Sequence, residues 1–291
     1  MVSHNLQLYT TLGETRYLVE SPWGDFKPGP YIVTDVAVSK KGHVLVLVRR
    51  VPFKGQSGPA VIELDPDGRF VREWADECVD AHYITVAEDG RILIVDRDSH
   101  VVLVFSEAGE LQLELGARGH GGKPLNHPCD VAIDSEGNFF VADGYGAAKI
   151  HQFSPDGQLV RSWGERGRAP GQLLTPHGIL VLPARGHGAE RLLVTDRDAN
   201  RLRVFTKDGK LVRELDDFHL PMSAEFTSDG NILVNDQTPR TSLLGPDLSF
   251  LGSARTMITI SHGFQPAPDG SIFEIHMATN SLTKLIPVSD K

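Results

Sequence analysis

One pattern recurs along the chain and limits the folds it can adopt more than any other feature. A short apolar segment leads through a polar turn with glycine into a β-branched strand, as in TDVAVSKKGHVLVLV, HYITVAEDGRILIVD, CDVAIDSEGNFFVAD and MSAEFTSDGNILVND. Alternating apolar residues bounded by Asp-Gly turns are typical of β-hairpins. Six such units of roughly 40 to 50 residues follow one another, which is the length of a propeller blade. The sequence therefore predicts an all-β fold, a six-bladed β-propeller.

The two ends of the chain indicate how this propeller closes. The last unit has no fourth strand after NSLTKLIPV, whereas a spare strand, TRYLVE, precedes the first unit. An N-terminal strand that completes the last blade would leave no open sheet edge. We therefore expect one propeller domain over residues 1–291, closed in this way.

The composition argues against several classes of partner. The formal net charge is −9, whereas nucleic-acid binding needs a basic face. No run of about 18 apolar residues predicts a membrane-spanning helix, and no basic segment followed by an apolar run predicts an export signal. Two cysteines, Cys78 and Cys129, are few for a secreted enzyme. We expect a cytoplasmic protein that acts on a small molecule, without nucleic-acid or membrane partners; the sequence leaves its oligomeric state open.

Alignment of the six units places one residue at the entrance of each innermost strand. In blade order these residues are Thr34, His82, Cys129, His177, Met222 and His262. Histidine thus occupies every second blade. The innermost strands of a propeller line its central channel, so alternate blades place these three side chains about 120° apart around the axis.

Three converging imidazoles predict a metal site. Three histidines with an open fourth position are the ligand set of a catalytic zinc site, and imidazole also binds iron, copper or nickel. The pattern therefore predicts Zn²⁺ or another divalent transition metal. A single channel histidine is more often a hydrogen-bonded structural residue, but three at one repeat position in strict alternation favour a metal.

One segment resembles a known family. HPCDVAIDSEGNFFVADGYGAAKIHQFSPDGQLVRSWGERGRAPGQLLTPHGILVLP contains DGY, QFSPDG, WGE, PGQ and PHG in the order and approximate spacing of NHL-repeat propellers of the peptidyl-α-hydroxyglycine α-amidating lyase (peptidylamidoglycolate lyase) type. The resemblance extends over the propeller and is densest in blades 3 and 4. It implies a zinc held by three histidines, which match His82, His177 and His262. It also implies a catalytic tyrosine, which matches Tyr145 of DGY, and an active-site arginine, which matches Arg49.

The same resemblance implies a structural calcium, bound by two backbone carbonyl groups that match Val36 and Ile84. The sequence departs from the family near the third histidine, because Gly263 replaces an aspartate that supports calcium and Ile260 replaces a pocket methionine. The missing carboxylate counts against Ca²⁺, and the changed pocket counts against a peptide substrate. Gly146 replaces a cysteine of a family disulfide, which fits a reducing compartment.

The predicted reaction is lyase cleavage of a carbinolamide, N–C(OH), into an amide and an aldehyde. The metal would act as a Lewis acid on the substrate hydroxyl, Tyr145 would accept the proton, and Arg49 would favour the phenolate. Arg49 or Arg50 could instead bind a substrate carboxylate. His127 and Ile260 are further candidates for substrate contacts.

Two other functions stay open from the sequence. A central metal also activates water, so the same histidines support a hydrolase of lactones or esters that needs no tyrosine base. A non-catalytic NHL interaction scaffold would bind no metal, and replacing its histidines would have no effect on function.

Overall fold

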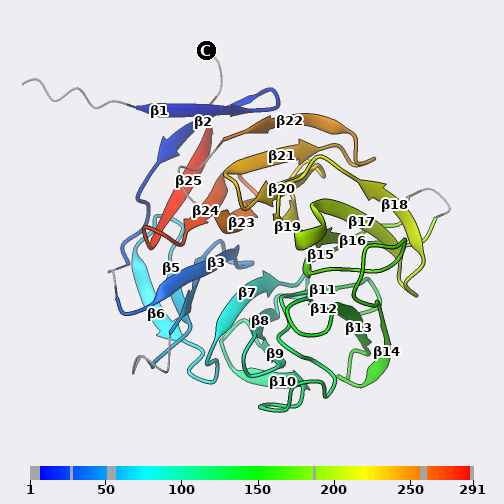
Figure 1. The fold of residues 1–291 in the computed structure, drawn as a ribbon. Coiled ribbons are helices and arrows are strands. Elements are labelled where there is room, and N and C mark those ends of the chain that lie inside the picture. Colours follow the sequence, from blue (N-terminus) through cyan, green and yellow to red (C-terminus); the bar gives the residue numbers. More distant parts are fainter. Residues whose placement is uncertain (1–6, 27–28, 51–56, 186–187, 256–260, 289–291) are drawn as a thin grey trace, which may run out of the picture.

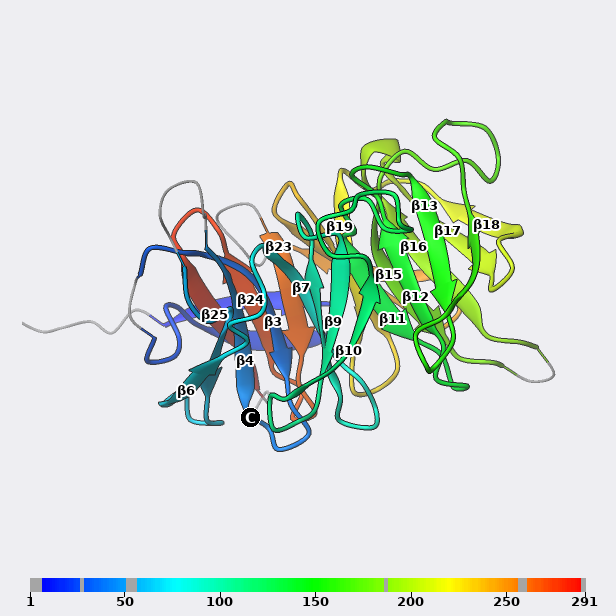
Figure 2. The ribbon, with the colours of Figure 1, turned by 90° about the horizontal axis from the view of Figure 1, so that it is seen from below.

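The architecture is a ring of six antiparallel sheets around a central axis (Figure 1). A computed structural model describes residues 7–26, 29–50, 57–185, 188–255 and 261–288. The first strand of each unit lies nearest the axis, and the strands of the blades run roughly along it (Figure 2). The prediction of an all-β, six-bladed propeller is confirmed.

The strands of each blade follow chain order from the axis outward, except in the last blade. Blade 1 contains β3 (Ile32–Val38), β4 (Val44–Arg49), β5 (Val61–Leu64) and β6 (Phe70–Trp74). Blade 2 contains β7 (Ala81–Val86), β8 (Ile92–Asp96), β9 (Val101–Phe105) and β10 (Leu111–Gly116). Blade 3 contains β11 (Asp130–Ile133), β12 (Phe139–Asp143), β13 (Lys149–Phe153) and β14 (Leu159–Trp163). Blade 4 contains β15 (Pro176–Leu182), β16 (Arg191–Asp196), β17 (Arg201–Thr206) and β18 (Leu211–Leu215). Blade 5 contains β19 (Pro221–Phe226), β20 (Ile232–Asp236), β21 (Arg240–Leu244) and β22 (Phe250–Ala254). Blade 6 contains β23 (Ser261–Pro266), β24 (Ile272–His276), β25 (Ser281–Val288), β2 (Thr15–Glu20) and β1 (Leu8–Leu12).

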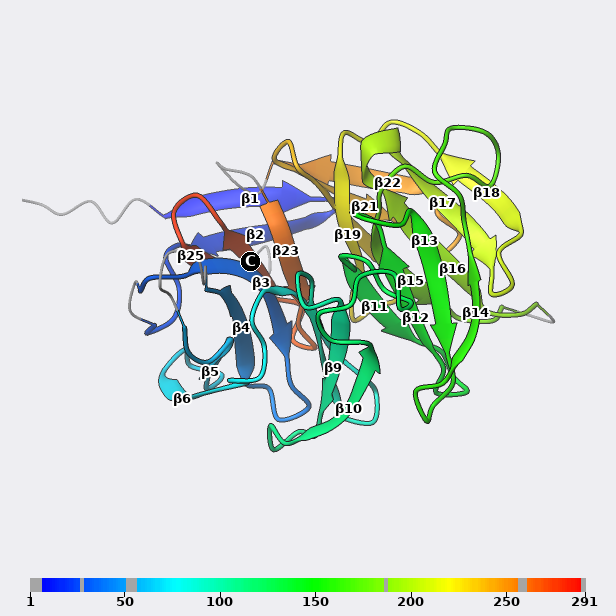
Figure 3. The ribbon, with the colours of Figure 1, turned by 60° about the horizontal axis from the view of Figure 1, so that its bottom comes forward.

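Blade 6 joins the two ends of the chain, as the sequence predicts. The TRYLVE strand, β2, pairs antiparallel with β25, from Arg16 opposite Val288 to Glu20 opposite Lys284. Figure 3 shows these blue and red segments side by side. The structure adds one element that the repeat did not predict, because β1 pairs with β2 as a fifth strand. Closure therefore removes the open edge that an incomplete last blade would leave.

The hairpin turns explain the spacing of the repeat. In blade 3 the turn between β11 and β12 begins at Asp134, whose Oδ1 accepts hydrogen bonds from the backbone N–H groups of Glu136 and Asn138. Gly137 has a φ of 83°, a left-handed conformation that glycine adopts without steric cost. Acid and glycine together thus fix the first hairpin of the blade.

The hydrophobic core lies between the blades. Six clusters of buried apolar side chains occur in the described part of the chain, and each joins residues of two neighbouring blades. One example is the packing of Leu45 and Leu47 of blade 1 with Ile92 and Ile94 of blade 2. This packing fixes the angle of each blade and hence the positions of the channel side chains. Within the described ranges, no helix is long and apolar enough to cross a membrane.

Candidate metal centre

The three histidines of the alternate-blade set enter the channel at irregularities in the innermost strands. The pairing between the first and second strands of blades 2, 4 and 6 shifts register beside His82, His177 and His262 respectively. A β-bulge bends its strand and re-aims a side chain, and such bulges are frequent next to active sites. One ring nitrogen from each histidine lies within 4.8 Å of the other two.

The neighbouring blades fix the orientation of each imidazole. The Nδ1 atom of every histidine in the set lies at hydrogen-bond distance from the backbone carbonyl at the ring position of the next blade. His82, His177 and His262 bond in this way to Cys129 at 2.8 Å, Met222 at 3.0 Å and Thr34 at 2.7 Å. A carbonyl oxygen only accepts, so each Nδ1 carries the hydrogen and each Nε2 keeps its lone pair.

This arrangement fits a divalent metal. All three histidines are buried, and burial holds the pKa of His82 and of His177 well below the ordinary value. Burial also lowers the pKa of His262 to about 3, with contributions from Arg49, Arg197 and Arg97. Metal ligation requires neutral imidazoles, usually with the second nitrogen bonded to a protein acceptor. The donor set therefore has the protonation state and the outer hydrogen bonds of a three-histidine metal site.

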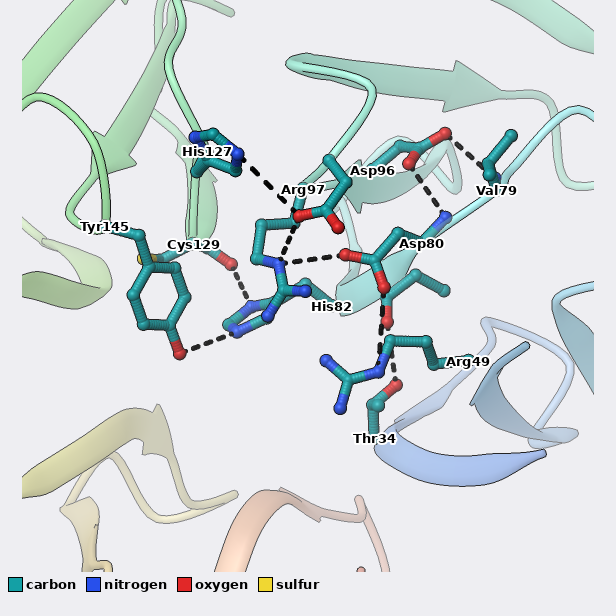
Figure 4. Close-up of polar contacts among 12 residues, drawn as sticks. Thr34, Arg49, Val79, Asp80, His82, Asp96, Arg97, His127, Cys129 and Tyr145 are labelled. Carbon is teal, nitrogen blue, oxygen red and sulfur yellow. Dashed lines mark hydrogen bonds and ion pairs between the residues drawn. The ribbon is translucent and has the colours of Figure 1, made fainter. Parts of the chain in front are cut away.

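Tyr145 completes the centre from blade 3. Its Oη lies 2.9 Å from Nε2 of His177. The same atom lies 3.2 Å from Nε2 of His82 (Figure 4). The glycine of DGY makes this approach possible, because a Cβ on Gly144 would lie 2.2 Å from the carbonyl oxygen of Pro176. The phenol thus lies where a substrate atom bound next to the histidines would meet it.

The arginine in contact with Tyr145 is not the one that the sequence predicted. Arg197 donates from Nη1 to the Tyr145 hydroxyl at 3.3 Å, and its guanidinium lies 5.2 Å from the ring centre. Arg97 lies 5.6 Å from the same centre. Burial nevertheless raises the pKa of Tyr145 to about 12, against the lowering effect of these two arginines. Without a metal, Tyr145 is therefore a neutral phenol at physiological pH.

Sequence reasoning missed Arg97 and Arg197, although a signal exists. Both stand in DRD, directly after the second strands of blades 2 and 4, which are also histidine blades. The preceding aspartates, Asp96 and Asp196, accept backbone hydrogen bonds from the loops that lead into the innermost strands. These structural roles of the aspartates are the reason why the whole motif was interpreted as structural.

The two adjacent arginines that the sequence predicted at the site, Arg49 and Arg50, have different surroundings. Arg49 reaches the centre and pairs through Nε with Asp80 at 3.6 Å. Arg50 is the first residue after β4 and has other partners. It donates to the Pro59 carbonyl and pairs with Glu73. The structure thus gives no support to Arg50 as a substrate ligand.

His127 lies beside the site rather than in it, with Nδ1 3.0 Å from Oδ1 of Asn126 and Nε2 3.9 Å from Oδ1 of Asp98. Ile260 lies outside the described residues.

Tyr83 is a further residue that the alignment did not single out. It follows His82 in β7, and its ring lies 4.9 to 5.5 Å from the imidazole rings of His82, His177 and His262. Its hydroxyl donates to the His262 carbonyl at 2.6 Å. The equivalent residues of the other two histidine blades are Gly178 and Gly263. Tyr83 therefore packs against the whole set and restricts the movement of its imidazoles.

The predicted calcium site lacks a complete ligand set. Val36 and Ile84 are buried, but Gly263 supplies no side-chain oxygen. The space of that missing side chain is filled by Asp35, whose Oδ1 lies 1.8 Å from where a Cβ would be. The Oδ2 atom of Asp35 accepts a hydrogen bond from the Ile84 N–H at 2.9 Å. Calcium binding therefore stays a prediction, and no step of the chemistry below depends on it.

Three acids lie further along the innermost strands, and they predict a pH effect on stability. Burial raises the pKa of Asp35 well above its ordinary range, that of Asp130 to about 7 and that of Glu225 to about 8. The Asp130 carboxylate contributes to the shift at Glu225 by repulsion.

Glu225→Gln is expected to flatten the pH dependence of unfolding. A carboxyl whose pKa is higher in the folded state loses stability as pH rises from its unfolded pKa to its folded pKa, here from about 4.5 to about 8. The wild-type free energy of unfolding should fall by roughly 3 kcal/mol more than that of the variant between pH 5 and pH 9. Urea denaturation at several pH values measures this, with exposed Glu136→Gln as the control. Parallel curves for wild type and Glu225→Gln would contradict it.

Comparisons with known proteins find sequence relatives among amidating enzymes and an NHL-repeat protein. No family model matches the sequence. The chain is 30% identical over 232 residues to peptidyl-glycine alpha-amidating monooxygenase A of Xenopus laevis, covering 71% of this chain and 24% of that protein. It is 25% identical over 221 residues to peptidyl-alpha-hydroxyglycine alpha-amidating lyase 1 of Drosophila melanogaster, covering 65% and 40%. It is also 25% identical over 265 residues to human NHL repeat-containing protein 3, covering 81% and 75%.

Solved structures share the fold at low sequence identity. A gluconolactonase from Xanthomonas campestris superposes with a TM-score of 0.70 at 16% identity, over 95% of this chain and 91% of that one. Virginiamycin B lyase from Staphylococcus aureus gives 0.63 at 12%, over 93% and 88%. These likenesses establish the propeller and nothing finer.

The sequence relatives are more specific, but the chain spans only about a quarter of the length of the frog monooxygenase that it matches. The curated relatives are amidating lyases, monooxygenases with the amidating name and an NHL-repeat protein. Together with the six blades and the three-histidine cluster, they identify the chain as an NHL-type β-propeller that resembles the peptidyl-α-hydroxyglycine α-amidating lyases.

Proposed function

We propose that this protein is a metal-dependent lyase that cleaves the C–N bond of a carbinolamide to give an amide and an aldehyde. The observation that carries the proposal is the juxtaposition of the Tyr145 hydroxyl with two of three neutral, pre-oriented imidazoles. The amidating lyases among the relatives support the same chemistry. A bound divalent ion would supply Lewis acidity at an open coordination position.

The residues of the chain divide the remaining work. His82, His177 and His262 would hold the ion through Nε2. Tyr145 would take the proton from the substrate hydroxyl through Oη as the C–N bond breaks, and the leaving amide nitrogen would end with a proton. Arg197 would stabilise the phenolate that forms, because it already donates to Oη. The reaction needs no oxidant or reductant.

Metal analysis and product analysis test the proposal together. Protein purified without chelator is expected to contain close to one divalent metal per chain and to release glyoxylate from α-hydroxyhippurate, a small hydroxyglycine derivative. A chelator should abolish release, and zinc should restore it. A parallel panel of lactones tests the alternative chemistry.

Each outcome decides between functions. Acid release from lactones without glyoxylate from α-hydroxyhippurate would contradict the lyase and favour a hydrolase. Less than about a tenth of a metal per chain, with no gain on adding zinc, would exclude metal chemistry and favour an NHL scaffold.

A further inference from the structure

Tyr83 carries a side chain at a strand position where the other two histidine blades have none. It comes directly after the first histidine of the set, in the place of Gly178 in β15 and Gly263 in β23. A Cβ at Gly178 would lie 2.8 Å from the carbonyl oxygen of Met222. A Cβ at Gly263 would lie 1.8 Å from Oδ1 of Asp35. Of these three equivalent positions, only that of Tyr83 therefore extends a side chain towards the imidazoles.

The ring of Tyr83 lies against all three imidazoles. It stacks on His262, with 4.9 Å between the ring centres and 27° between the planes. Its centre lies 5.0 Å from that of His82 and 5.5 Å from that of His177. The three imidazole centres are themselves 4.8 to 5.5 Å apart. The phenol ring is thus about as close to each imidazole as the imidazoles are to one another, and it restrains all three.

The hydroxyl group of Tyr83 joins blade 2 to the far side of the ring of blades. It donates to the His262 carbonyl at 2.6 Å, and Nδ2 of Asn235 donates to the same carbonyl at 3.4 Å. Oδ1 of Asn235 accepts hydrogen bonds from the N–H and the hydroxyl of Ser223, both at 2.9 Å. His262 lies where the pairing of β23 with β24 shifts register. Side chains of blades 2 and 5 therefore hold the backbone of the third histidine where its own strand pairing is irregular.

Tyr83 and Tyr145 approach the imidazoles from different ends of the channel. Tyr145 follows β12 and lies at the rim where the innermost strands begin. Tyr83 lies within β7, and burial raises the pKa of its phenol well above the ordinary value, with a contribution from Asp35 and Asp130 further along the innermost strands. The Tyr83 phenol is therefore neutral and keeps the proton that it donates. This arrangement leaves the rim as the side from which a ligand can reach the histidines.

We infer that Tyr83 is a positioning residue, which holds His262 and closes the channel behind the three histidines, so that a bound metal ion keeps its open coordination position towards Tyr145. The inference rests on the proposed metal site and goes beyond it, because it assigns part of the metal affinity to a residue that does not touch the ion. Loss of the hydroxyl should loosen the backbone of His262. Loss of the ring should leave a cavity beside the imidazoles.

Zinc affinity tests the role of the hydroxyl without any reaction. Tyr83→Phe keeps the stacked ring and removes the donor to the His262 carbonyl. Competition with a chromophoric chelator should show that the variant binds zinc about tenfold more weakly than the wild-type protein does. Tyr9→Phe is the matched control, because it removes a hydroxyl that is hydrogen-bonded to Gln7 in β1, at the outer edge of blade 6. The control should keep the wild-type affinity, and equal affinity of Tyr83→Phe and wild type would overturn the inference.

Tyr83→Gly tests the role of the ring, because it gives blade 2 the residue of the other two histidine blades. This variant should bind zinc about 100-fold more weakly than wild type. p-Cresol has the structure of the tyrosine side chain and should recover at least about tenfold of this affinity by filling the cavity. Toluene lacks the hydroxyl and should recover less than about threefold. A folded Tyr83→Gly protein whose zinc affinity does not respond to p-cresol would contradict the positioning role; if this variant does not fold, Tyr83→Phe decides.

The failure of this inference and the failure of the proposed lyase give different results. Zinc affinity that depends on Tyr83, in a protein that releases no glyoxylate from α-hydroxyhippurate, supports the positioning role and contradicts the lyase. Glyoxylate release with equal zinc affinity in Tyr83→Phe and wild type supports the lyase and overturns the positioning role. A wild-type protein that binds no zinc would contradict both. At saturating zinc, Tyr83→Phe should keep kcat within about threefold of the wild-type value, because Tyr145 is unchanged.

Discussion

Tyr145→Phe is expected to lower kcat/KM for α-hydroxyhippurate by about 10³-fold and to leave the metal content unchanged. The variant keeps the ring that packs against His82 and His177 and removes only the Oη atom, which lies 2.9 Å from Nε2 of His177 and 3.2 Å from Nε2 of His82. In the described part of the chain, Tyr145 is the hydroxyl group that is hydrogen-bonded to these two Nε2 atoms. Without it, the proton of the substrate hydroxyl should pass to solvent. Glyoxylate release and zinc stoichiometry, measured on the same preparation, check the two halves of the prediction.

Tyr17→Phe provides the control for this substitution. Tyr17 lies in β2 in the outer part of blade 6, far along the sheet from the innermost strand. It should keep wild-type activity. Near wild-type activity of Tyr145→Phe would show that Tyr145 is not the base. If that variant lost glyoxylate release and kept hydrolysis of a lactone, the two reactions would depend on different groups of one metal site.

The alternation of histidines could be predicted because a propeller repeats its geometry. Residues at one repeat position lie at one height around the axis, so their register in the sequence carries directly into space. The repeat also predicted the closure of blade 6 by β2, because a spare N-terminal strand can complete the incomplete last blade. Tyr145 and Arg49, by contrast, were suggested by the family resemblance and not by the repeat.

The sequence could not show which way the rim side chains turn. Arg49 and Arg50 are adjacent, and only the structure shows that Arg49 pairs with Asp80 next to the centre while Arg50 pairs with Glu73. Arg97 and Arg197 stand beside aspartates with structural roles, so the DRD motif was interpreted as structural although it occurs in two histidine blades. The backbone acceptors also could not be predicted from residue types. Cys129, Met222 and Thr34 orient the histidines through their carbonyl groups and not through their side chains.

The non-histidine blades thus have a function of their own. Each histidine depends on the blade that follows it for the hydrogen bond at Nδ1, so blades 1, 3 and 5 set the tautomers of blades 6, 2 and 4. These contacts survive any side-chain change at Thr34, Cys129 or Met222 that preserves the backbone. This explains how unlike residues can occupy the alternate positions without disturbing the centre.

His177→Ala is expected to reduce bound metal to below about a tenth per chain and to abolish both glyoxylate release and any lactone hydrolysis. Two imidazoles would remain, and the hydroxyl of Tyr145, 3.2 Å from Nε2 of His82, is a neutral phenol. His120→Ala, at an exposed loop position, should keep full metal content. Metal analysis after gel filtration and thermal unfolding of both variants separate loss of a ligand from loss of the fold.

The result for His177→Ala also separates the three functional classes. A lyase and a hydrolase both require the metal, so both lose activity with it. A non-catalytic scaffold predicts a folded wild-type protein with no metal and no change in the variant. If the variant kept one metal per chain, the ion would bind elsewhere in the protein. The assignment of Tyr145 as the base would then lose its basis. The ligand nitrogens of three buried, neutral histidines lie within 4.8 Å of one another, which is typical of a metal site. We therefore expect the variant to lose both the metal and the activity.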